Sequence, residues 1–214
     1  RRMSEQSALF PTYAQYPVTF AKGDGCRLWD EQGKEYIDFM SGIAVTGLGH
    51  AHPKVKQRLV QQLDRLWHVS NLFPIPEQEA LAKALTEHSC ADAVFFCNSG
   101  AEANEAAIKL ARKYQQKVKE KSKYEIITFV QSFHGRTLAT LTATGQDKVK
   151  DGFNPLPDGF RYVPYNDEQA LREAITEQTG AIMLELVQGE GGVNPAKQSF
   201  VDAIVQLCRE HDLL

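Results

Sequence analysis

The sequence lacks any long run of apolar residues. No stretch approaches the ~20 consecutive apolar residues that a membrane-spanning helix needs, so we expect no membrane partner. Residues 1–6 also lack the apolar segment of a secretory signal. Both absences favour a soluble, cytoplasmic protein.

Cysteine is sparse, and none of it occurs in a C-x-x-C pair. The spacing argues against a disulfide framework and against a zinc site, and it is typical of reduced thiols in the cytoplasm. His50 and His52 lack the helical spacing of metal ligands, so we predict no metal site. The four cysteines are Cys26, Cys90, Cys97 and Cys208. Cys97 ends an apolar run, and we expect it to be a small core residue.

The chain also lacks a strong excess of charge. It has 24 Lys and Arg against 27 Asp and Glu, a net charge of −3, which implies no nucleic-acid partner. The one basic run, residues 113–123, is diluted by Glu120 and is typical of a solvated helix end. Neither G-x-x-x-x-G-K-[ST] nor G-x-G-x-x-G occurs, which disfavours a generic α/β nucleotide-binding domain.

The N-terminal third shows mixed local patterns. Prolines predict an irregular arm over residues 1–22, followed by a hairpin with strands at 27–29 and 36–39. Pro53 is expected to begin a helix, and a second helix is expected over 76–88. The apolar face predicted for the first of these helices is Val55, Leu59, Leu63 and Leu66.

From residue 94 the pattern alternates between strands and helices. This alternation predicts an α/β fold with a mostly parallel central sheet and flanking helices. Ligands in such sheets bind beyond the carboxyl ends of the strands. The predicted strands are 94–97, 125–130 and 181–187, and the predicted helices are 101–117, a short piece after Arg136, 167–177 and 199–211.

The loop after the first of these strands has the parts of an anion site. Small polar residues at 98–100 stand between an apolar run and a helical pattern. The first turn of such a helix offers free backbone N–H groups and the positive end of the helix dipole. Ser99 adds a hydroxyl donor. Spacing alone leaves an ordinary strand-to-helix turn equally open.

The other two loops carry further candidate residues. Residues 131–137 hold Phe133 and Arg136, which without further information are a core aromatic and a surface ion-pair residue. We interpret His134 as a structural, hydrogen-bonding histidine. Two acidic residues flank the third loop, Glu185 and Glu190, and a solvent-facing turn residue is the alternative for Glu190.

The text of residues 98–105, Asn-Ser-Gly-Ala-Glu-Ala-Asn-Glu, resembles the phosphate-binding turn of class III pyridoxal-phosphate-dependent aminotransferases. Within that family it is most similar to the N-acetylornithine branch, and residues 67–73 share that similarity. The resemblance implies the fold type I of these transferases, incomplete in this chain. It also implies an N-terminal arm with part of the small domain over 1–60, and the first part of the large cofactor-binding domain over 61–214.

The resemblance gives each candidate residue a role. It implies that Ser99, Gly100 and Ala101 cradle the phosphate of pyridoxal 5′-phosphate. Phe133 resembles the aromatic residue that stacks on the pyridine ring. The remaining two matches concern the substrate: Arg136 resembles the arginine that grips a carboxylate, and Glu190 a glutamate at the substrate mouth.

The implied reaction moves the δ-amino group of N-acetylornithine to 2-oxoglutarate, a step of arginine biosynthesis, in a homodimer. Succinylornithine, ornithine and 4-aminobutyrate stay open as amino donors. The family's chemistry needs a lysine that forms a Schiff base with the cofactor and an acid that holds its ring nitrogen protonated.

Neither the lysine nor the acid has a matching motif in these 214 residues. We therefore expect no catalytic residue within this chain. The first hypothesis is a truncated part of a working aminotransferase that is inactive and poorly stable alone. The second hypothesis is a complete, non-catalytic protein that binds a phosphate or a partner.

Overall fold

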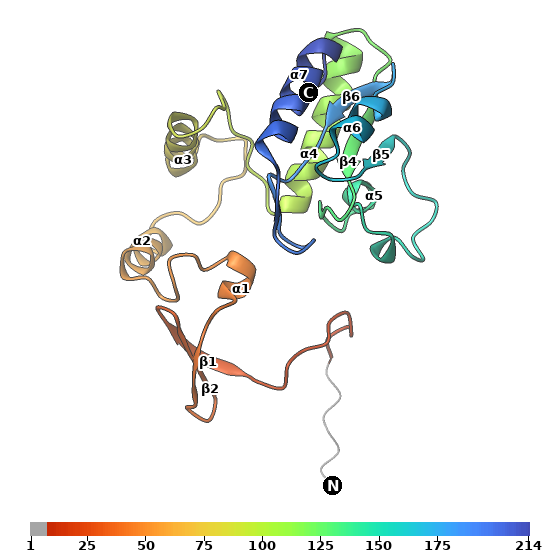
Figure 1. The fold of residues 1–214 in the computed structure, drawn as a ribbon. Coiled ribbons are helices and arrows are strands. Elements are labelled where there is room, and N and C mark those ends of the chain that lie inside the picture. Colours follow the sequence, from red (N-terminus) through yellow and green to blue (C-terminus); the bar gives the residue numbers. More distant parts are fainter. Residues whose placement is uncertain (1–7) are drawn as a thin grey trace. The chain divides into compact units, whose positions relative to one another are not determined.

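The computed structural model describes residues 8–214, and the chain divides into two compact units between Leu81 and Ala82 (Figure 1). The expectation of no secretory signal in residues 1–6 lies outside the described residues, as do the first seven residues of the predicted arm. The boundary predicted after residue 60 concerns the domains of the complete family fold and stays a prediction.

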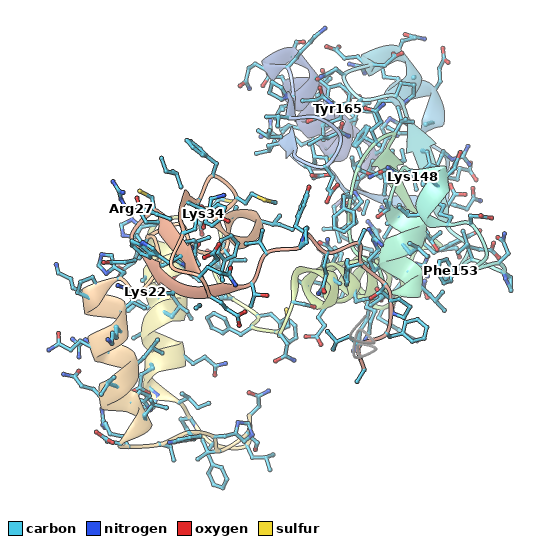
Figure 2. The ribbon with its side chains drawn as sticks, turned by 90° about the horizontal axis from the view of Figure 1, so that it is seen from below. Lys22, Arg27, Lys34, Lys148, Phe153 and Tyr165 are labelled. Carbon is cyan, nitrogen blue, oxygen red and sulfur yellow. The ribbon has the colours of Figure 1, made fainter. Side chains whose placement is uncertain are left out.

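The first unit is built on a three-stranded antiparallel sheet in the order β1 (Phe20–Asp24), β2 (Arg27–Asp30) and β3 (Glu35–Ile37). The predicted hairpin is confirmed, while β1 adds a strand where the predicted arm ends. Oδ1 of Asp30 accepts the turn N–H groups of Gln32 and Lys34 at 3.0 and 2.8 Å. Lys34 and Arg27 both belong to this hairpin (Figure 2).

Three helices follow the hairpin: α1 (Ser41–Ala44), α2 (Pro53–Leu63) and α3 (Pro76–Glu87). The two predicted helices are confirmed at their first residues, because proline fits the first helical turn, where no backbone donor is needed. The predicted apolar face is shorter than expected, since Leu66 lies beyond the end of α2. None of the residues of α2 is buried.

The second unit contains a parallel sheet in the order β5–β4–β6, formed by β5 (Phe160–Val163), β4 (Glu125–Phe129) and β6 (Thr179–Ile182). In register, Ile127 of β4 stands opposite Arg161 of β5 and Ile182 of β6. The predicted parallel sheet is confirmed. Strand β5 was missed, because it has only four residues and its side chains do not alternate between buried and exposed, with Val163 alone buried.

Helices cover both faces of this sheet, with the π-helical turn Tyr114–Val118 extending α4 (Figure 1). The helices are α4 (Gly100–Lys113), α5 (Leu138–Ala143), α6 (Glu168–Ala174) and α7 (Gln198–His211), and a 3₁₀ turn spans Asp147–Val149. On one face, side chains of β4 pack with α6 and α7 around the fully buried Phe200 and Leu171. On the other, Ile126 and Ala181 pack with α4 and α5 through Ile108 and Ala143.

Two strand predictions need correction. Residues 94–97 are not a strand, and Cys97 is exposed rather than a core residue. A strand needs a neighbour for its backbone groups, and within residues 8–214 this apolar run has none. The strand predicted over 181–187 is shorter: β6 ends at Ile182, and β7 (Val187–Gln188) instead pairs antiparallel with β8 (Asn194–Pro195).

No helix in the described part of the chain combines the length and apolarity needed to cross a bilayer. Helix α7 illustrates why: it is amphipathic, with Phe200, Ala203, Ile204 and Leu207 buried along one face. Cys208 of the same helix is half-buried and also packs against this core.

Candidate functional site

The first element of the site is the N-terminus of α4. Ser99 is the N-cap residue, and its Oγ accepts the backbone N–H of Glu102 at 3.2 Å. The Glu102 carboxylate in turn accepts the backbone N–H of Asn98 at 2.7 Å. Within residues 8–214, the N–H groups of Gly100 and Ala101 have no partner. Two free donors therefore stand at the positive end of a 14-residue helix.

The second element is the loop that follows β4, which lies against the first turns of α4. Asn104 donates from Nδ2 to the carbonyl oxygen of His134 at 2.8 Å. Thr137 hydrogen-bonds through its hydroxyl to the Glu105 carboxylate. Gly135 has φ +136°, and a Cβ placed on it would lie 2.9 Å from the Cβ of Ala101. The loop thus approaches α4 more closely than a larger residue at 135 would allow.

The structure brings two of the predicted side chains together in this loop. The guanidinium carbon of Arg136 lies 5.6 Å from the centroid of the Phe133 ring, within the range of a cation–π contact. Phe133 is half-buried and Arg136 is exposed. Neither lies in a hydrophobic core cluster or an ion pair among the described residues. Both side chains are therefore available to a ligand at this edge of the sheet.

The third element is the segment that follows β6. Oε1 of Glu185 accepts the backbone N–H of Phe133 at 2.9 Å, and Oε2 accepts the N–H of Gly189 at 3.4 Å. The buried Gln188 donates from Nε2 to the carbonyl oxygen of Val130 at 3.0 Å. These contacts tie the second and third loops together beyond the carboxyl ends of β4 and β6, as expected for a parallel sheet.

Glu190 lies in the turn between β7 and β8. Its side chain is exposed and, in the described part of the chain, has no hydrogen-bond or ion-pair partner. The remaining predicted residues, Ser99, Gly100 and Ala101, lie at the start of α4. The second loop, residues 131–137, contacts both the first turns of α4 and the segment that follows β6.

His134 belongs to the second loop, and its carbonyl oxygen accepts the hydrogen bond from Asn104 of α4. It is 4% exposed, and its Nε2 is buried without a partner in residues 8–214. Its backbone N–H donates to Oγ1 of Thr144 at 2.9 Å. Burial lowers the pKa of the His134 imidazole below its ordinary value, opposed by the nearby Glu185 carboxylate. The imidazole is therefore neutral at pH 7.

A cavity of about 560 Å³ opens beside these residues. Its lining combines apolar side chains of α4 and β6 with Phe133, His134 and Glu185. Sequence reasoning assigned no role to Glu185 or Asn104. For Glu185 the one available signal is its position near the end of a predicted strand, just before a glycine-rich turn. No group of three His, Cys, Asp or Glu side chains within residues 8–214 could hold a metal ion.

The sequence matches a known protein family over nearly its whole length. The family description "Aminotransferase class-III" matches residues 10–214. The acetylornithine aminotransferase of Halalkalibacterium halodurans is 58% identical over 97% of this chain and 53% of its own length. That of Thermosynechococcus vestitus is 54% identical over 95% of this chain and 51% of its own length. The chain thus spans about half the length of these curated relatives.

Solved structures give the same fold. The ornithine aminotransferase of Toxoplasma gondii, which holds pyridoxal phosphate at partial occupancy in its active site, aligns with a TM-score of 0.90. Its sequence is 34% identical, and the match covers 97% of this chain and 49% of that one. The N-acetylornithine aminotransferase of Stenotrophomonas maltophilia aligns with a TM-score of 0.79 and 43% identity, covering 94% and 50%. With residues 10–214 matched, this chain belongs to the class III aminotransferase family.

Proposed function

We propose that this chain is part of a pyridoxal-phosphate-dependent aminotransferase that moves the δ-amino group of N-acetylornithine to 2-oxoglutarate. The observation that carries the proposal is the loop of Phe133 and Arg136 lying against the N-terminus of α4. The identities of 50–58% to acetylornithine aminotransferases favour this donor over ornithine. Such an enzyme would serve arginine biosynthesis.

The residues present fit a phosphorylated, planar cofactor. A phosphate needs several donors and a positive potential, and the two unpartnered N–H groups of Gly100 and Ala101 at the start of α4 offer both. Ser99 adds its hydroxyl. A flat ring needs an aromatic face, which the half-buried Phe133 can supply. Pyridoxal phosphate, when bound, supplies an electron sink for the carbon that carries the amino group.

The other residues of the site act on the substrate. Arg136 is exposed, and its planar guanidinium can bind the α-carboxylate of N-acetylornithine through two parallel hydrogen bonds. This contact would hold the far end of the donor while the δ-amine reaches the cofactor. Glu190 would lie at the mouth of the site, where its free carboxylate can pair with a cationic group. By analogy with the family, the working unit is a homodimer.

The test is amino transfer by the protein expressed from its complete reading frame. Purified protein with pyridoxal phosphate is mixed with 2-oxoglutarate and one of four donors: N-acetylornithine, succinylornithine, ornithine or 4-aminobutyrate. Glutamate formation gives kcat/KM for each. We expect the highest value with N-acetylornithine. A higher value with another donor would reassign the substrate, and no glutamate from any donor would refute the proposed reaction.

A further inference from the structure

Two loops of the proposed site meet at a single carboxylate. Glu185 follows β6. Its carboxylate accepts the backbone N–H of Phe133 in the second loop and that of Gly189, four residues after Glu185 in the third loop. The distances are 2.9 Å to Phe133 and 3.4 Å to Gly189, each to a different carboxylate oxygen. Hydrogen bonds to an ionised acceptor are stronger than those between neutral groups. One side chain therefore fixes two backbone segments.

Both segments carry a residue that the proposed function needs. The Phe133 N–H belongs to the residue whose ring would stack on the cofactor, and Gly189 directly precedes Glu190. Glu185 itself is held by its own backbone, since its carbonyl oxygen accepts the hydroxyl of Tyr165 at 2.7 Å. Tyr165 packs its ring against Phe129 and Phe200 in the core. The carboxylate is thus anchored to the rigid part of the unit.

We propose that Glu185 is a positioning residue that fixes the Phe133 ring and the Glu190 turn through their backbone N–H groups. It touches neither cofactor nor substrate in this role. The inference rests on the proposed function for what the two loops do. The bridge between the loops, in contrast, is a property of the protein without cofactor, and it can be measured separately.

The test uses graded variants of the protein expressed from its complete reading frame. In Glu185→Gln the amide oxygen can accept only one of the two N–H groups, and in Glu185→Ala neither has an acceptor. Glu185→Asp keeps the carboxylate on a shorter side chain. Glu177→Gln is the control, because Glu177 is exposed and has no partner among the described residues.

Amide hydrogen exchange without cofactor measures the bridge. We expect exchange at Phe133 and Gly189 to accelerate from wild type to Gln to Ala, with no change in the control. Wild-type exchange at both amides in Glu185→Ala would overturn the inference, whatever the protein's activity. The denaturant midpoint of unfolding is measured alongside, so that a general loss of stability is seen as such.

Pyridoxal phosphate affinity measures the consequence for the site. We expect the dissociation constant to rise roughly tenfold in Glu185→Ala at a nearly unchanged unfolding midpoint, and less in Glu185→Asp. Unchanged affinity in Glu185→Ala would overturn the positioning role even if exchange accelerates. A wild-type protein that binds no pyridoxal phosphate would refute the proposed function instead, while the exchange data would still decide the bridge.

Discussion

Arg136 is exposed and contacts the Phe133 ring without an acidic partner in the described part of the chain. If it holds the donor carboxylate, Arg136→Ala removes a charge-assisted contact made to the substrate and not to the cofactor. We expect KM for N-acetylornithine to rise roughly tenfold to a hundredfold, with the pyridoxal phosphate affinity nearly unchanged. Steady-state kinetics check this, with the exposed Arg172→Ala as control. Wild-type kinetics in Arg136→Ala would remove the residue from the site.

Gly135 tests the close approach of the second loop to α4. A Cβ at this residue would lie 2.5 Å from Oγ1 of Thr140 and 2.9 Å from the Cβ of Ala101, at φ +136°. We expect Gly135→Ala to lower the free energy of unfolding by about 1–3 kcal/mol, measured by urea denaturation. Gly152→Ala is the matched control, because its φ is also positive, at +81°, but open space surrounds it. Equal losses in both variants would mean that crowding contributes nothing.

Among the residues of the site, the sequence identified those that stand within a family motif. Ser99, Phe133 and Arg136 could be singled out because a family motif surrounds each of them. Glu185 could not, since its role depends on two backbone N–H groups, one of them 52 residues away along the chain. A hydrogen bond between residues so far apart in the chain leaves no pattern in the sequence around either of them.

At the scale of elements, α7 is held to the sheet by aromatic packing. Phe200 is fully buried, with its ring centroid 5.4 Å from that of Phe129 and 5.9 Å from that of Tyr165. We expect Phe200→Ala to lower the free energy of unfolding by about 3–5 kcal/mol, measured by chemical denaturation. Phe153→Ala, which removes a ring that is 55% exposed, should change it far less. Similar losses would contradict this account of the core.

Ion pairs join the C-terminus of α7 to the segment that follows the π-helical turn Tyr114–Val118. Asp212, the left-handed C-cap of α7, binds Nζ of Lys121 at 2.7 Å and of Lys119 at 3.0 Å, and these bonds lower its pKa to about 2. Its pKa is lower in the folded state, so the resulting stability is present above pH ~4 and is lost as the pH falls towards 2. We expect wild type to lose more stability across this window than Asp212→Asn, measured by thermal unfolding. Parallel curves would show that the ion pairs contribute nothing.

The spacing of apolar residues predicted helices well where one face of the helix is buried. It predicted strands poorly, because a strand depends on backbone pairing with a neighbouring strand. Helix α7 was predicted to within one residue at its start because its apolar spacing reports its buried face. The apolar run at 94–97 failed as a strand, because apolar character does not supply a neighbouring strand. Strand β5 was missed for the opposite reason: its pairing with β4, not its composition, makes it a strand.

At the scale of the whole molecule, many large apolar side chains of the described residues are exposed, among them Trp67 at 80%, Phe95 at 73% and Leu186 at 63%. Exposed apolar area of this kind favours association. We expect the 214 residues expressed alone to self-associate, with sedimentation velocity showing larger species as concentration rises. A sharp, reversible melt of a monomer would contradict this expectation.

The proposed function requires that the protein to which this chain belongs bind pyridoxal phosphate and use it in catalysis. The most direct test is the intact mass of the protein from its complete reading frame after incubation with pyridoxal phosphate and borohydride, which fixes the cofactor to its lysine. We expect one reduced cofactor per chain, with peptide mapping placing it on a single lysine. An unchanged mass would contradict the proposed use of pyridoxal phosphate. The protein would then share the fold of its family but not the cofactor chemistry.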